Sequence, residues 1–154
     1  MKFFLTEQFK KIASYLRNYL KPEINNLKFL LGQSAILSSR AASNNFKDLW
    51  DAEVKVYSQW GEDGILDYIC EAIGISKPNV IEIGAGNFIE CNSRFLAESR
   101  NANIIAVDGR NDLIDNVKFS SVFWKSQIIP LVDWVTPDKI NSIILLGEEK
   151  FGKI

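Results

Sequence analysis

The first part of the chain alternates apolar and polar residues at the spacing of an α-helix. Over residues 1–21 this pattern predicts an amphipathic helix, whose apolar positions are Leu5, Phe9, Ile12, Leu16 and Tyr19. The opposite side is basic, with Lys2, Lys10, Lys11, Arg17 and Lys21 against Glu7. Such a helix either docks on a membrane surface or partner, or packs on the domain with its basic side in water. Because the apolar face is not unusually bulky for an interfacial anchor, we expect the packed arrangement.

A second helix is expected to begin at Pro22, since proline suits the first position of a helix. Its apolar positions are Leu27, Leu30, Leu31, Ile36 and Leu37. The polar run SSRAASNNFKD, residues 38–48, then predicts a connector. We therefore expect an N-terminal helical extension over residues 1–50 and a second unit over residues 51–154.

From residue 54 onward, short apolar runs alternate with helical patterns. VKVYSQWGEDG is a short β-leaning run followed by a turn rich in glycine and acid, and the next helix is expected to end at Gly74. We then predict strands at NVIEIG, at NIIAVDG and, on a weaker pattern, at QIIPLV. Helices are expected across 91–100, from Asn111, and from Thr136-Pro137 to Gly147. Strands that alternate with helices indicate parallel pairing and an α/β fold.

The residue types exclude several kinds of catalytic machinery. The 154 residues contain no histidine, which excludes Ser-His-Asp and Cys-His nucleophiles, histidine bases and histidine metal sites within this chain. Cys70 and Cys91 have no metal-site spacing, so we expect buried free thiols in a reducing compartment and predict no metal. A net charge of −1 gives no argument for nucleic-acid binding. With no signal-peptide pattern and no apolar run of membrane-spanning length, we expect a cytoplasmic protein without a membrane span.

The stretch VIEIGAGNFIECNSRF, residues 80–95, carries the strongest candidate chemistry. Ligands of parallel sheets bind beyond the carboxyl ends of the strands, where Gly84 and Gly86 let the backbone turn sharply and approach a ligand. A lone G-x-G turn is also typical of an ordinary strand–helix connection. Asp108 ends the next strand, where a carboxylate would face a bound ribose or simply cap a helix. The two features together favour an adenosine-type ligand.

Two residues favour S-adenosylmethionine (SAM) over NAD as that ligand. A dinucleotide fingerprint requires a third glycine where this chain has Ile89. Glu82 lies two residues before Gly84, where its carboxylate repels phosphates and suits a positively charged ligand. SAM carries a sulfonium and an ammonium group, so electrostatics favours SAM as the cofactor.

Four blocks of sequence, in this order, resemble a branch of the SAM-dependent methyltransferases related to the FkbM type. The blocks are SQWGEDGILDYI, VIEIGAGNFIECNSRFLAE, NIIAVDG and VTPDKINSIILLG, and they span roughly residues 48–147. The resemblance implies a class I, Rossmann-like fold. It also implies methyl transfer to a hydroxyl group, often on a sugar or another small metabolite.

The resemblance further implies a set of cofactor-binding residues. Glu82, Gly84, Ala85, Gly86 and Asn87 match the first SAM motif. Asp108 matches the acid that holds the ribose, with Gly109 beside it, and Gln59, Glu62 and Asp63 belong to an element near the cofactor pocket. For Glu62 and Asp63, helix capping and turn formation are an equal alternative, and Asn92 and Ser93 are expected to cap the helix after the glycine turn. No catalytic residue is assigned.

Relatives continue beyond the fourth block into a strand with an acidic SIDIDG-like segment, which this sequence does not contain. We therefore expect residues 51–154 to be the N-terminal half of a methyltransferase domain, a fragment that need not be active alone. In the class I order the missing strand pairs with the first, so we expect NVIEIG to be an exposed edge. Two alternatives stay open: a non-catalytic partner-binding module with a degenerate methyltransferase fold, and an NAD-dependent oxidoreductase.

Overall fold

Three short segments rich in the β-branched residues Ile and Val form a parallel sheet at the centre of the fold. The computed structural model describes residues 2–154, except for the side chains of residues 2–6, 17 and 18. The strands are β1 (Asn79–Ile83), β2 (Asn103–Asp108) and β3 (Ile128–Val132), and they lie in the order β1-β2-β3. All pairs are parallel, so the three carboxyl ends meet at one edge of the sheet. The predicted strands and the α/β class are confirmed.

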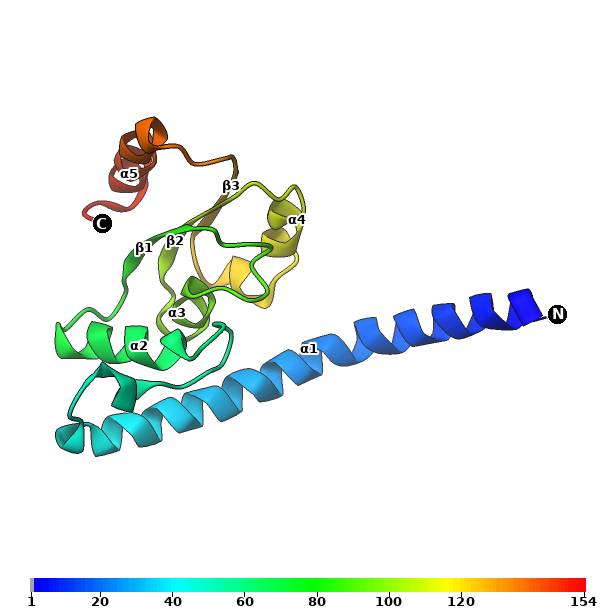
Figure 1. Ribbon diagram of the computed structural model, residues 1–154, viewed down its shortest axis with the longest axis horizontal. Helices are drawn as coiled ribbons and strands as arrows, with labels where there is room; N and C mark the ends of the chain where they lie inside the picture. Colours follow the sequence, from blue (N-terminus) through cyan, green and yellow to red (C-terminus); the bar gives the residue numbers. More distant parts are fainter. Residues whose placement is uncertain (1) are drawn as a thin grey trace.

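Helices cover both faces of the sheet, because successive residues of each strand point to opposite sides. On one face, Ile81, Ile105 and Ile129 belong to a cluster with α5 (Pro137–Phe151). On the other face, Val80, Ile104 and Ile128 belong to a cluster with α3 (Ser93–Arg100) and α4 (Leu113–Lys118). Figure 1 shows α5 on the side of the sheet opposite α2 and α3. The result is a three-layer arrangement around two separate apolar clusters.

The helix α2 (Glu62–Ala72) forms as its apolar spacing predicts. Gly74 follows it with φ +72°, a left-handed conformation that terminates a helix and favours glycine. The run before α2 is not a strand, contrary to the β-leaning pattern of VKVYS. The backbone amides of Val56, Tyr57 and Ser58 donate instead to the buried Asp63 carboxylate, so they are not free for a neighbouring strand.

The N-terminal part is one continuous helix, α1 (Lys2–Ala42), rather than two helices separated at Pro22. A proline inside a helix removes one hydrogen bond, to the carbonyl four residues earlier. Pro22 is exposed, so water can replace that bond. The predicted connector is shorter than 38–48, because α1 continues to Ala42 and short 3₁₀ turns follow at Ser43–Asn45 and Leu49–Ala52.

Among the described side chains of α1, those of its second half pack on the rest of the chain. Phe29 and Ile36 join a cluster with Val56, Tyr57 and Phe95. The first half extends away from the sheet and its helices (Figure 1). The expectation that residues 1–21 pack on the domain is therefore wrong, since the described apolar side chains Phe9, Ile12, Leu16 and Tyr19 are all exposed. The side chains of Lys2, Leu5 and Arg17, which that expectation also used, lie outside the described ones.

The last helix, α5, begins as predicted, with Thr136 at the N-cap and Pro137 in the first position. It does not end at Gly147. That glycine lies inside the helix, where an added Cβ would come within 2.9 Å of Ile154 and 3.3 Å of Ile81. Gly147 therefore permits close packing of α5 on β1, and the helix continues to Phe151. The side chain of Asn79 donates to the carbonyl of Phe151, the last residue of the helix, and to that of Lys153 beyond it. Within residues 2–154, no helix is both long and apolar enough to cross a bilayer.

Candidate functional site

The turn after β1 adopts a conformation that depends on its glycines. Gly84 has φ +84° and Gly86 has φ +59°, and side-chain-bearing residues rarely adopt such values. The amides of Gly84 and Ala85 both donate to the carbonyl of Val107, at 2.8 and 3.1 Å, and Ala85 is fully buried. Beyond the adjoining residues, no described heavy atom lies within 4 Å of the position that a Cβ would take at either glycine. Hydrogen bonds to Val107 of β2 therefore hold the turn on one side. The other side is open, which leaves the backbone of Gly84 and Gly86 accessible to a ligand.

Asp108 lies directly beside this turn, as predicted. Its Oδ2 accepts from the Gly86 amide at 2.9 Å, and its Oδ1 accepts from the Arg110 amide at 3.0 Å. An ionised carboxylate offers about four acceptor positions. The two described bonds leave about two of them free, enough to accept from a pair of neighbouring hydroxyl groups such as those of a ribose.

Glu82 points toward the N-terminus of α3. Its Oε1 accepts from the Asn92 amide at 2.8 Å, and its Oε2 accepts from both the amide and the hydroxyl of Ser93. The side chains of Asn92 and Ser93 do not cap α3 as expected; Glu82 supplies the cap from ten residues upstream. With most of its acceptor positions used, Glu82 would act on a ligand through its charge rather than by a direct hydrogen bond.

Asp63 is a buried anchor for the segment before α2. Its Oδ2 accepts from three successive amides, those of Val56, Tyr57 and Ser58, and from the Ser58 hydroxyl at 2.9 Å. This geometry corresponds to the turn-forming alternative. Among the described residues, no hydrogen bond connects Asp63 to the glycine turn at 84–86.

Glu62 and Gln59 also make only local contacts. Glu62 begins α2, and its Oε2 accepts from the Trp60 amide at 2.9 Å. Hydrogen bonds from its own amide and from that of Trp60 hold the pKa of the Glu62 carboxyl below its usual value. Gln59 is exposed, and its carbonyl accepts from the Lys55 ammonium at 2.6 Å. The structure therefore brings Glu82, Gly84–Asn87 and Asp108–Gly109 together. Gln59, Glu62 and Asp63 instead bond to residues 55–60 around the start of α2, and none of their described hydrogen bonds reaches the glycine turn.

Trp134 is a candidate site residue that the sequence interpretation missed. It follows β3, and its indole lies so close to Gly109 that a Cβ there would be 2.7 Å from the ring. The amide of Asp133 donates to the carbonyl of Asp108 at 3.0 Å, which holds this segment against the end of β2. The indole is 79% exposed. An open aromatic face beside Asp108 suits the stacking of a planar ring such as adenine. The one sequence signal was an aromatic residue just after the third strand, at the ligand-binding edge.

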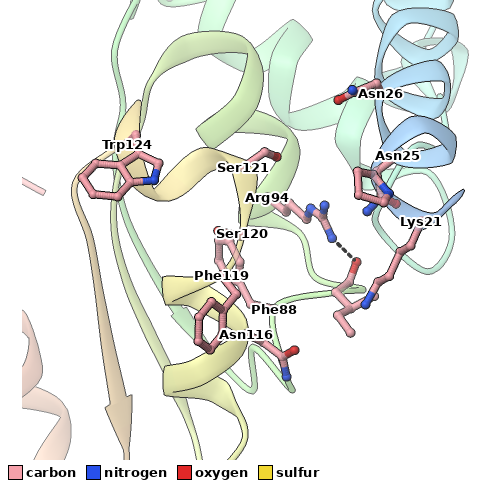
Figure 2. Close-up of a pocket in the computed structure, with 12 residues that line it drawn as sticks. Lys21, Asn25, Asn26, Phe88, Arg94, Asn116, Phe119, Ser120, Ser121 and Trp124 are labelled. Atoms are coloured by element: carbon pink, nitrogen blue, oxygen red, sulfur yellow. Dashed lines mark hydrogen bonds between the residues drawn. The ribbon is translucent and has the colours of Figure 1, made fainter. Parts of the chain in front are cut away.

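A cavity of about 470 Å³, lined by both polar and apolar side chains, opens between α1 and the loop that follows the glycine turn. Figure 2 shows that Lys21 and Asn25 of α1 face Phe88 and Arg94 across it. Arg94 donates to the carbonyl of Ile89 at 3.2 Å. Lys21 and Arg94 line this cavity and none of its described lining residues is acidic, so its charge favours anionic small molecules. Sequence spacing could not reveal it, because residues 21–26 and 88–124 meet only in the folded chain.

Both cysteines are buried and free, as expected. Burial, and then the charge of Glu82, raise the pKa of the Cys91 thiol far above its usual value. Burial also raises the pKa of Cys70. Within the described part of the chain, no group of three or more potential ligands is arranged to hold a metal ion.

Comparison of the sequence with protein-family models, with curated proteins and with solved structures gives no match. Any function assigned to this chain therefore rests on its own residues, through the resemblance carried by the four sequence blocks and the geometry of the site.

Proposed function

We propose that this chain is a SAM-dependent methyltransferase, related to the FkbM type and of the class I, Rossmann-like fold, acting on a hydroxyl of a sugar or small metabolite. One observation carries the proposal: the glycine turn after β1 is open to a ligand and is hydrogen-bonded to Asp108 at the end of β2. Both features lie at the carboxyl ends of parallel strands, where ligands of such sheets generally bind, and this supports the proposal.

The charges around this edge favour SAM over a dinucleotide. Glu82 and Asp108 lie next to the turn. Asp112 and Asp133 follow β2 and β3, but Arg110 and Lys139 pair with them and offset their charge. The carboxylates of Glu82 and Asp108 therefore supply the charge that repels a pyrophosphate and attracts the sulfonium and ammonium groups of SAM. Ile89 also stands in place of the third glycine that a dinucleotide fingerprint requires.

Each residue of the site has a role in this proposal. Gly84 and Gly86 present their backbone to the cofactor, Asp108 accepts from the ribose hydroxyls, and Trp134 stacks on the adenine. Bound SAM would supply an electrophilic methyl group, so the protein's contribution is to hold the acceptor oxygen in line with it. No side chain of the described site is assigned as a general base.

A second function, a partner-binding module, has a different observation in its favour. Within residues 2–154, β1 has a strand on one side only. Along its other side runs a groove of about 470 Å³ lined mainly by apolar residues, and Ile83 is 52% exposed there. Such an edge can accept a strand from another chain. A stable dimer in size-exclusion chromatography that Ile83→Lys dissociates would favour this function.

Titration calorimetry with SAM and NAD in parallel tests the methyltransferase proposal. We expect binding of SAM and none of NAD. Asp108→Asn should weaken SAM binding by about tenfold, because it removes a charged acceptor. Trp134→Ala should weaken it several-fold. Two matched controls, Asp115→Asn in the exposed first turn of α4 and Trp50→Ala at an exposed tryptophan, should leave affinity unchanged. Binding of NAD alone, or equal SAM binding by Asp108→Asn, would overturn the assignment.

A further inference from the structure

Among the side chains of α1 that the structure describes, those on one face contact the rest of the chain and those on the opposite face do not. The contacting face carries Phe29, Gly32, Ile36 and Arg40, which recur every three or four residues. Gly32 lies so close to Val56 that a Cβ there would be 2.3 Å from its side chain. This face holds the second half of α1 on the domain.

A second face of α1 is apolar and exposed. We call it the leucine face, and it consists of Phe9, Leu16, Leu20, Ile24, Leu27 and Leu31. These residues also recur at steps of three, four or seven, so they share one side of the helix. The exposed fraction is 75% for Phe9 and 72% for Leu31, although Leu31 lies only one residue from Gly32 on the contacting face. The leucine face therefore points away from the domain along its whole length of about 33 Å.

The shape of the leucine face fits a flat surface better than a single partner helix. Leu16, Leu20 and Ile24 are separated by two successive steps of four, which breaks the alternation of three and four in a coiled-coil seam. Exposed Ile12, Tyr19 and Leu30 widen it on one side. A face of this width exceeds the narrow stripe that one neighbouring helix covers.

The charge of α1 indicates what kind of surface it meets. Residues 1–42 contain seven Lys and Arg against two Asp and Glu, a net charge of +5, so the rest of the chain carries −6. The side chains of Lys10, Lys21 and Lys28 are exposed. Two copies of such a helix would repel each other, whereas an anionic surface would attract it.

We propose that α1 lies in the plane of an anionic lipid surface. The leucine face enters the boundary between headgroups and acyl chains, and the lysines contact the headgroups. Because the contacting face lies on another side of α1, this orientation holds the domain on the aqueous side, with the helix parallel to the membrane rather than across it. This inference is independent of the proposed methyltransferase activity.

Sedimentation of the full chain with lipid vesicles tests the proposal. We expect the chain to bind vesicles that contain phosphatidylserine at least tenfold more tightly than pure phosphatidylcholine vesicles, and high salt to weaken the binding. The double variant Leu20→Asp/Leu27→Asp should lose at least tenfold in binding. Its matched control, Leu145→Asp, changes a comparably exposed leucine on α5 and should bind like the unmodified chain.

Two further measurements separate membrane docking from misfolding and from self-association. Circular dichroism should show that the double variant keeps its helix content, since both leucines are exposed. Hydrogen exchange should show protection of the amides of residues 9–31 on phosphatidylserine vesicles only. The proposal is overturned if the unmodified chain binds neither vesicle type, if the double variant binds as well as the unmodified chain, or if the leucines instead hold together a dimer in solution.

Discussion

The carboxylate of Asp108 accepts a hydrogen bond from the backbone amide of Gly86 across 2.9 Å. This bond joins the turn after β1 to the end of β2, two segments that are 22 residues apart in sequence. It orients the acid toward the open side of the turn and holds the positive φ of Gly86 in place. A change at Gly86 should therefore affect both the stability of the turn and the orientation of Asp108 toward a ligand.

Replacing Gly86 by alanine should affect both stability and ligand binding. An alanine in the left-handed region costs about 1 kcal/mol, and its methyl group would project into the open space above the turn. Gly74→Ala is a matched control, because Gly74 also has positive φ and open space around it but lies after α2. Urea denaturation should show similar losses for both variants, whereas calorimetry should show weaker SAM binding for Gly86→Ala only. Equal effects of the two variants on SAM would exclude the turn from the site.

Glu82→Gln should destabilise the fold by about 1 kcal/mol, because the amides of Asn92 and Ser93 would lose a charged acceptor at the N-terminus of α3. Glu82→Ala should cost more, since it leaves those amides without any acceptor. Glu90→Gln, at an exposed position in the same loop, is the control and should be neutral. Chemical denaturation measures all three; a neutral Glu82→Gln would show that the cap contributes no charge-dependent stability.

Asp67 should be among the most sensitive positions for folding. Its side chain is 1% exposed and lies between two arginines, with Arg40 Nη2 at 2.7 Å and Arg100 Nε at 2.8 Å from Oδ1. Asp67→Ala would leave both cations without this partner and should cost about 3–5 kcal/mol of unfolding free energy.

A comparison of ion pairs provides the control for Asp67. The pair between Arg110 and Asp112 is exposed, so Arg110→Ala should change stability by less than about 1 kcal/mol. Because Arg40 belongs to α1, Asp67→Ala should also increase hydrogen exchange in the second half of that helix. Unchanged exchange there would show that the apolar contacts of Phe29 and Ile36 are sufficient to hold α1.

Alkaline pH should destabilise the protein. Burial raises the pKa of the Cys91 thiol and of the Tyr57 phenol in the folded state, whereas the unfolded chain ionises them near 9.0 and 10.0. Unfolding therefore releases protons above about pH 9, and stability should fall there by up to about 1.4 kcal/mol per pH unit for each group. Below that range the two groups are neutral in both states and contribute no pH dependence. Denaturation curves at pH 7.5 and 10 should show the fall, and Cys91→Ala should reduce it; an unchanged slope in that variant would contradict this assignment.

Local patterns were sufficient for most of the secondary structure. The apolar runs at NVIEIG, NIIAVDG and QIIPLV form β1, β2 and β3. They could be recognised as strands because each is short, rich in Ile and Val, and lies between helical patterns. Two predicted helix boundaries were wrong: the start at Pro22 and the end at Gly147. In both places a residue that breaks isolated helices is tolerated: water can replace the bond that Pro22 removes, and close packing of α5 on β1 requires Gly147.

The site was predicted in part. Gly84, Gly86 and Asp108 met as expected, because parallel strands place their carboxyl ends together. For Asp63 the sequence left two roles open, and for Glu82 it did not predict the cap on α3, since a carboxylate takes its role from the amides that surround it. Trp134 was missed because its approach to Gly109 depends on the path of the chain after β3.

By itself, the sequence determined the alternation of strands and helices, the parallel sheet and the position of the glycine turn, because these follow from hydrophobic periodicity and from the backbone freedom of glycine. Only the tertiary structure decided which carboxylates are buried anchors, which lie beside an open backbone, and which side of α1 is left without a partner. Those outcomes depend on contacts between residues far apart in the chain, such as Arg40 with Asp67 and Gly32 with Val56, which periodicity does not record.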